Sequence, residues 1–315
     1  MTLRAHPSNG VGRSVVVRVP AKINLYLSIG PRRPDGFHEL MTVFLAVSMY
    51  DQLTASPADG LSLSVRGEGA TLVPLDAGNL AWRAAALLAE YAGVPADASL
   101  ELVKEIPVAA GLAGGSADAA AALVACDELW GTGLNRATLL ELAGRLGSDV
   151  PFLLHGGMAL GTGRGELLTP VLATGEWHWV LALAEGQLST TEVYAELDRL
   201  RGDQPVPPRP PERLINGLRV RDSRAVAKAL SNDLQPAALS LRPALRATLR
   251  EGEHLGAYAG LVSGSGPTCA FLVDSASAAV RLAAALAGAG VCRTVRIVHG
   301  PVHGARRVPA SPAPG

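Results

Sequence analysis

Residues 107–123, PVAAGLAGGSADAAAAL, place three glycines just before a run rich in alanine. Alanine has the highest helix propensity, so the run predicts a helix, with Ser116 as its N-cap. The glycines cost backbone entropy, but at their positions the backbone is free of Cβ atoms. Because a helix N-terminus carries unpaired N–H groups and a partial positive charge, this bare backbone predicts a binding site for a polyanion. Close packing of the helix against a strand is the alternative reason for the same glycines.

The glycine loop differs from two widespread nucleotide-binding patterns. No lysine follows Gly115, which excludes a GxxxxGK[ST] loop, and the spacing of the glycines does not fit GxGxxG. The hydroxyl of Ser116 could cap the helix, or it could bind phosphate or a phosphate-bound Mg²⁺ instead. If the loop binds a nucleotide, it does so in another kind of fold.

Composition narrows the class of protein. The chain has 315 residues, 48% of them apolar, and its 28 basic residues balance 28 acidic ones. This balance argues against a nucleic-acid or membrane-surface partner, which needs a concentrated positive field. No segment approaches the roughly 18 apolar residues of a membrane span, and the N-terminus lacks the apolar core of a signal peptide. Cys126, Cys269 and Cys292 form no zinc-binding pattern, which predicts buried reduced thiols in a cytoplasmic protein.

The pattern along the chain predicts two α+β domains. Strand-like alternation dominates the beginning, where the turn residues 34–36 (PDG) are expected to join two long strands into a hairpin. Helical segments follow, and a second series of strands and helices fills the rest of the chain. We expect domains at 14–160 and 161–300. The flanking segments 1–13 and 301–315 are rich in small residues and proline, and we expect them to be flexible tails.

Three motifs in order resemble those of the GHMP kinase superfamily. PVAAGLAGGSADAA resembles its phosphate-binding motif, PAKINLYL its first motif and LVSGSGPTCAFLV its third. Within the superfamily, PAKINLYLSIGPRRPDGFHEL, LGSDVPFLLHGG and ALGTGRGE resemble the family of 4-diphosphocytidyl-2-C-methyl-D-erythritol kinases. The resemblance covers about residues 15–300. By itself, the third motif is a plain tight turn; within the family it packs near the phosphate loop.

The resemblance implies both a fold and a reaction. The fold is an N-terminal ATP-binding α/β domain with a left-handed βαβ unit, against the usual handedness, and a C-terminal ferredoxin-like domain. The reaction is ATP-dependent phosphorylation of the 2-hydroxyl of 4-diphosphocytidyl-2-C-methyl-D-erythritol in the non-mevalonate isoprenoid pathway. Mg²⁺ is the implied cofactor, and its ligands stay unassigned because no acidic residue stands out. We expect no nucleic-acid, membrane or obligatory protein partner. The alternatives are another superfamily kinase, such as homoserine kinase, and a nucleotide-binding relative without catalysis.

Lys22 and Asp149 are the candidate catalytic residues. By itself, Asp149 fits a cap for the segment that begins at Pro151, and Lys22 fits a solvent-facing lysine on an edge strand. The resemblance implies instead that Asp149 accepts the proton of the acceptor hydroxyl. Lys22 then keeps that carboxylate ionised and neutralises the transferring phosphoryl group. Asn24 shares a strand face with Lys22, so we expect it to bind acceptor hydroxyls.

The resemblance also implies two sets of binding residues. Phe37 matches the position that stacks on cytosine, His38 the residue that reads its edge, and Tyr194 the ring over its other face. Without the resemblance, Phe37 fits a loop residue packed into the core and Tyr194 an ordinary residue of an amphipathic helix. Tyrosine is frequent at the Phe37 position. The implied ATP-binding residues form the glycine-loop segment: Pro107, Val108, Ala109, Ala110, Gly111, Leu112, Ala113, Gly114, Gly115, Ser116 and Ala117.

Overall fold

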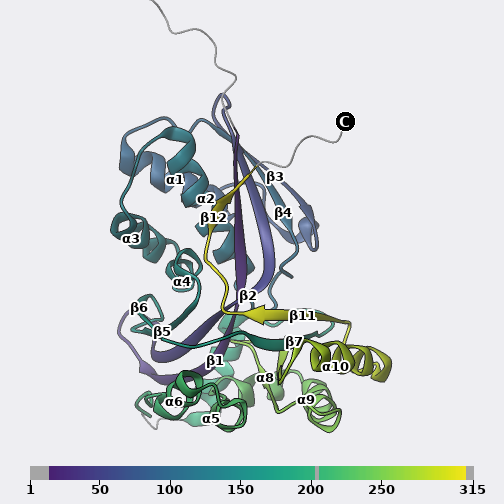
Figure 1. Cartoon of the computed structure of the whole chain (residues 1–315). Coiled ribbons are helices and arrows are strands. Elements are labelled where there is room, and N and C mark those ends of the chain that lie inside the picture. Colours follow the sequence, from purple (N-terminus) through teal and green to yellow (C-terminus); the bar gives the residue numbers. More distant parts are fainter. Residues whose placement is uncertain (1–13, 203–205, 310–315) are drawn as a thin grey trace, which may run out of the picture.

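Two β-sheets organise the chain, which the computed structural model describes over residues 14–202 and 206–309 (Figure 1). The strands of the larger sheet are β1 (Val15–Arg32), β2 (His38–Ser56), β3 (Leu61–Gly67), β4 (Ala98–Lys104), β5 (Met158–Thr162), β6 (Leu167–Pro170), β8 (Ser231–Asn232) and β12 (Arg306–Val308). Its main path runs β12-β1-β2-β4-β3. The smaller sheet is antiparallel in the order β11-β7-β10-β9, with strands β7 (Trp177–Leu183), β9 (Ala259–Val262), β10 (Cys269–Val273) and β11 (Thr294–Gly300).

The helices fall into two groups in chain order. The first group is α1 (Leu80–Ala92), α2 (Gly114–Trp130), α3 (Arg136–Leu146) and α4 (Val150–His155), with a 3₁₀ turn at Ala70–Leu72. The second group is α5 (Thr190–Arg201), α6 (Glu212–Val220), α7 (Ser223–Ala229), α8 (Gln235–Leu241), α9 (Leu245–His254) and α10 (Ala276–Ala289). None of the helices in the described part of the chain has the length and apolar character needed to cross a lipid bilayer.

The predicted hairpin is confirmed. β1 and β2 pair antiparallel along nearly their whole length, and the turn closes where the Arg33 N–H donates to the Phe37 carbonyl at 2.6 Å. Gly36 adopts a φ of 86°, a left-handed conformation that favours glycine. The hairpin therefore carries the first motif and the Phe37–His38 segment on one continuous element.

The alanine-rich helix α2 lies in the middle of the core. It packs against α1 on one side and against β1 and β2 on the other (Figure 1). Ten of its residues, from Gly114 to Cys126, are buried, as expected for a helix that is apolar on every side. The prediction that Ser116 caps this helix is wrong: α2 begins at Gly114, and its N-cap is Ala113, with a left-handed φ of 59°. Ser116 therefore lies inside the first turn.

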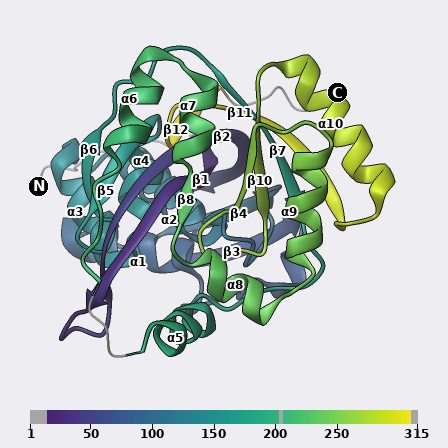
Figure 2. The ribbon, with the colours of Figure 1, turned by 90° about the horizontal axis from the view of Figure 1, so that it is seen from below.

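The smaller sheet separates two hydrophobic clusters. Alternate residues of β7 face opposite ways: Trp179 and Leu181 belong to the larger cluster, which includes α2 and the residues of α6 and α7, whereas Val180 and Ala182 pack with residues of α5, α8, α9 and α10. Helices α9 and α10 contact the strands of this sheet and cover its outer face (Figures 1 and 2). Burial raises the pKa of Cys126 and of Cys269 to about 12, which keeps both thiols protonated. The other thiol, Cys292, is half-buried.

Two expected boundaries differ in the structure. The predicted domain boundary near 160 falls inside β5, which pairs with β2, and β6 extends the same sheet to Pro170. The expected tail 301–315 is wrong for its first part, because β12 returns to the first domain and pairs with β1 at Val16–Arg18. The sequence of this segment, rich in small residues and proline, has no apolar pattern that predicts a strand. The strand is stabilised by its pairing with β1. Residues 310–315 and the expected tail 1–13 lie outside the described residues.

Candidate active site

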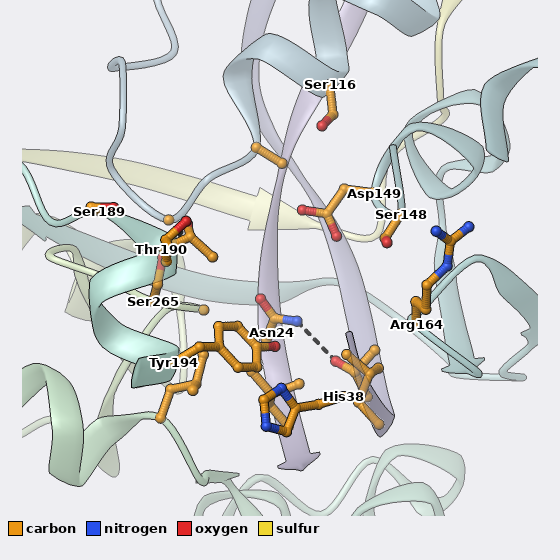
Figure 3. Close-up of a pocket in the computed structure, with 18 of the residues that line it drawn as sticks. Asn24, His38, Ser116, Ser148, Asp149, Arg164, Ser189, Thr190, Tyr194 and Ser265 are labelled. Atoms are coloured by element: carbon orange, nitrogen blue, oxygen red, sulfur yellow. Dashed lines mark hydrogen bonds between the residues drawn. The ribbon is translucent and has the colours of Figure 1, made fainter. Parts of the chain in front are cut away.

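A cavity of about 750 Å³ lies between the glycine loop, the β1–β2 hairpin and helix α5. Both domains contribute to its wall, since α5 belongs to the second group of helices. In Figure 3, Ser116 and Asp149 lie at one end of the view, and Tyr194 and His38 lie at the other. The cavity therefore joins the residues expected to act on phosphate to those expected to act on a base.

Lys22 and Asp149 meet inside this cavity. Lys22 Nζ lies 3.5 Å from Asp149 Oδ2, and the Lys22 side chain is only 6% exposed, whereas that of Asp149 is 31% exposed. The alternative interpretation of Lys22 as a solvent-facing lysine on an edge strand is thus wrong, because β1 lies inside the sheet and the glycine loop crosses over it. The Asp149 side chain makes no capping hydrogen bond among the described residues, although Asp149 occupies the N-cap position of α4. Its carboxylate is left to face the cavity (Figure 3).

Hydrogen bonds fix the direction of the Lys22 ammonium. It donates to Asn24 Oδ1 at 2.8 Å and to the Gly111 carbonyl at 3.3 Å. The other end of the Asn24 amide donates to Thr42 Oγ1 at 2.8 Å (Figure 3). Thr42 in turn donates to the Tyr26 carbonyl. Thr42 was missed by the sequence analysis. The hairpin register, which places β2 beside β1, is the signal that could have found it.

Each glycine of the loop meets a different neighbour. A Cβ on Gly111 would lie 2.1 Å from the Ser263 carbonyl oxygen, and one on Gly114 would lie 3.2 Å from Lys104 Nζ. These two glycines serve close packing, which was the alternative reason for them. A Cβ on Gly115 would meet only Leu80 Cδ1, at an ordinary 3.7 Å. Gly115 is therefore the position at which the bare backbone leaves space in the cavity.

The expected ATP-binding residues divide by position. Those that line the cavity are Ala109, Ala110, Gly111, Ala113, Gly114, Gly115 and Ser116. Pro107 and Val108 instead line a smaller hollow of about 230 Å³ behind the loop. Leu112 and Ala117 are fully buried in the core. Ala109 and Ala113 both have a left-handed backbone, at φ 52° and 59°, a conformation that residues other than glycine rarely adopt.

The third motif holds the glycine loop from behind. Ser263 Oγ donates to the Gly111 carbonyl at 3.1 Å, across 152 residues of sequence. Asn232 Nδ2 donates to the carbonyls of Val262 and Gly264, both at 2.7 Å, and so fixes the turn itself. Ser265 lines the cavity, 3.0 Å from the hydroxyl of Thr190. The motif thus packs beside the loop, as the resemblance implied.

The residues expected to hold a base gather at the far end of the cavity. Phe37 is 50% exposed, which excludes a residue packed into the core, and Arg164 Cζ lies 4.9 Å from the centre of its ring. The rings of His38 and Tyr194 lie 5.1 Å apart, and His38 Nε2 is 2.9 Å from Asp198 Oδ1. Burial, and then the charges of nearby carboxylates, raise the pKa of the Tyr194 phenol, which keeps it protonated.

Arg164 and Asp198 were not predicted as site residues. Asp198 follows Tyr194 by one helical turn on α5, so the helical spacing was a usable signal. Arg164 stands in the quoted stretch ALGTGRGE, to which no role was assigned. Both side chains line the cavity beside the expected base-binding residues.

Comparisons with known proteins agree with this geometry. The model of the GHMP kinases N terminal domain matches residues 79–157, and that of the GHMP kinases C terminal region matches residues 214–292. A protein of Mycolicibacterium gilvum named 4-diphosphocytidyl-2-C-methyl-D-erythritol kinase is 60% identical over 306 residues, which cover 96% of this chain and 95% of that protein. The chain belongs to the 4-diphosphocytidyl-2-C-methyl-D-erythritol kinase family.

Other members and relatives support the same placement. The kinase of that name from Salinispora tropica is 60% identical over 94% of this chain and 95% of its own length. A crystal structure of 4-(cytidine 5'-diphospho)-2C-methyl-D-erythritol kinase is 35% identical, with a TM-score of 0.74 over 90% of this chain and 98% of that one. Homoserine kinase from Cytophaga hutchinsonii reaches a TM-score of 0.76 over 97% of this chain and 100% of that one, but at 19% identity it shares the fold alone. The predicted two-domain GHMP kinase fold is confirmed.

Replacement of Gly115 by valine should weaken ATP binding and leave the fold intact. The added methyl groups project into the cavity, where the loop would receive phosphate, and Gly115 has room for a Cβ. We expect the dissociation constant for ATP, measured by calorimetry, to rise about tenfold or more, with little change in melting temperature. Gly111→Ala is the matched control: it should lower the melting temperature, because its Cβ has no space. Normal ATP binding by Gly115→Val would remove this part of the loop from the phosphate site.

Proposed function

We propose that this chain transfers the γ-phosphoryl group of ATP to the 2-hydroxyl of 4-diphosphocytidyl-2-C-methyl-D-erythritol, a step of the non-mevalonate isoprenoid pathway. The observation that carries the proposal is the Lys22–Asp149 pair, which lies in one cavity together with the glycine loop and the exposed ring of Phe37. The names of family members with about 60% identity support the same reaction.

ATP binds with its phosphates at the glycine loop. The N–H groups at the start of α2 and the positive end of its dipole favour an anion there. The chain's kinase family works with a divalent cation, and we propose Mg²⁺. When bound, the cation neutralises phosphate charge. The described residues contain no cluster of three or more metal-ligating side chains, so a cation in the cavity would take most of its ligands from phosphate and water, with the Ser116 hydroxyl as the protein oxygen that lines the phosphate end.

Asp149 acts as the general base. Its carboxylate accepts the proton of the 2-hydroxyl while that oxygen forms the new bond to phosphorus and the bond from phosphorus to the leaving ADP breaks. Lys22 stabilises the carboxylate before transfer and the phosphoryl charge during it. Its hydrogen bonds to Asn24 and Gly111 hold the ammonium in place beside Asp149.

Cytosine binds at the other end of the cavity. Phe37 stacks on one face of the base, His38 lies at its edge, and Tyr194 approaches the other face. Arg164, over the ring of Phe37, holds that ring in the cavity and adds a positive charge close to the diphosphate. Because this end lies away from the reacting hydroxyl, its binding energy positions the acceptor and takes no part in the chemistry.

An acceptor panel with an Asp149 variant tests the reaction. The purified chain should form ADP from ATP with 4-diphosphocytidyl-2-C-methyl-D-erythritol and not with homoserine, which has no base to stack. Asp149→Asn should lower kcat for that acceptor roughly 10²–10⁴-fold, the usual effect of a general base, with little change in KM for ATP. Glu141→Gln, at an exposed position of α3, is the matched control and should be unaffected. Near-normal kcat in Asp149→Asn would exclude the assigned role.

Truncation of Phe37 tests the recognition of the base. Stacking contributes about 1–3 kcal/mol per base, so Phe37→Ala should raise KM for the acceptor about tenfold and leave KM for ATP nearly unchanged. Phe37→Tyr keeps the ring and should behave like the parent chain. If both KM values rose together in Phe37→Ala, general damage to the fold would explain the result and stacking would not.

A further inference from the structure

A buried charge cluster lies behind the glycine loop. Lys104, the last residue of β4, is 3% exposed, and its ammonium donates to Asp118 Oδ2 at 2.7 Å and to Asp51 Oδ2. Asp118 belongs to α2 and Asp51 to β2, and both side chains are almost fully buried. The reaction proposed above uses none of these three groups.

The cluster fastens both ends of the glycine loop. Asp51 Oδ1 accepts hydrogen bonds from the backbone N–H groups of Glu105 and Ile106, at 2.7 and 2.9 Å, directly before the loop. Asp118 stands in α2, directly after it. Lys104 joins the two carboxylates, so one ammonium connects the entry of the loop to its exit.

The same ammonium lies close to the cavity wall. A Cβ on Gly114 would be 3.2 Å from Lys104 Nζ, and Gly114 itself lines the cavity from the other side. One glycine backbone therefore separates the ammonium from the space assigned to phosphate. Within this loop, Ala109 and Ala113 keep a left-handed backbone, which persists only when the surroundings hold it.

A buried charge cluster is a weak source of stability. Burial works against the Lys104 charge, but Asp118 and Asp51 outweigh it and raise the pKa of Lys104 above its ordinary value. Burial raises the pKa of Asp118 well above its usual range, and Asp118 Oδ1 has no hydrogen-bond partner among the described residues. A buried ion cluster of this kind can often be replaced by apolar side chains without loss of stability. Since two carboxylates accompany one ammonium, the cluster also adds no net positive charge to the site.

We propose that Lys104 is a positioning residue for ATP: tied to Asp51 and Asp118, it holds the glycine loop and the start of α2 in the conformation that receives the triphosphate. This inference rests on the proposed function in one respect, namely that ATP binds at the loop. It assigns Lys104 an effect on nucleotide affinity that acts through the backbone of residues 105–114.

The test compares a single and a double variant by calorimetric titration with ATP. Lys104→Met leaves two buried carboxylates without their cation and should lower the melting temperature sharply. The double variant Lys104→Met/Asp118→Leu removes the isolated charge on α2, while Asp51 keeps its two backbone partners. We expect the double variant to regain most of the melting temperature and still bind ATP about 10–100-fold more weakly, because the loop is no longer fixed.

The same double variant separates positioning from a purely structural role. Its KM for ATP should rise, whereas its KM for the acceptor and its kcat at saturating ATP should stay close to those of the parent chain. Recovery of ATP affinity together with the melting temperature would overturn the inference, and so would an equal rise in both KM values. If the parent chain binds ATP but forms no ADP with the acceptor, the proposed function fails, and the titration still decides the role of Lys104.

Discussion

The carbonyl oxygen of Gly111 is the point on which the site depends, because all three motifs meet there. Lys22 donates to it from β1, and Ser263 donates to it from the turn between β9 and β10. So close an approach is possible only because Gly111 has no Cβ, which would lie 2.1 Å from the Ser263 carbonyl oxygen. A shift of the strand, the loop or the turn must therefore move the other two. The two domains share one fixed point beside the cavity.

The cavity beside this point has two ends, and the proposed function assigns phosphoryl transfer to one and binding of the base to the other. At the phosphate end, the Lys22 ammonium is held by the protein on two sides, and Asp149 stands at the start of α4, whose Phe152 ring stacks on Phe44 at 4.8 Å. In the proposed reaction, side chains held in this way need no rearrangement before phosphoryl transfer. The other end is more open and takes Tyr194 from the second domain. Under the proposed function, a long acceptor that touches both ends gains specificity from one and reactivity from the other.

Local patterns predicted the hairpin, the alanine-rich helix and the two-domain class, since alternation and helix propensity act over a few neighbouring residues. The pairing of Lys22 with Asp149 came from the family resemblance and not from the residues themselves. The predicted Ser116 cap failed because Ala113, with its left-handed backbone, is the N-cap, so the helix begins at Gly114 and Ser116 lies inside it. The expected tail after residue 300 failed because β12 forms only by pairing with β1, a partner nearly 300 residues away in the sequence.

The sequence by itself determined the family and the chemical character of the loop, which has glycines where an apolar helix begins. It also supplied Lys22 in PAKINLYL and Asp149 in LGSDVPFLLHGG as the accompanying charged residues. Only the tertiary structure decided which of these cavity-lining glycines leaves room for a Cβ and which are required by close packing. It also decided that His38 lies against Asp198, 160 residues later, and that Lys104 lies beneath the loop. The reason is geometric. These contacts depend on strand register and on how helices dock onto the sheet, and both follow from packing of the whole chain, which no local pattern encodes.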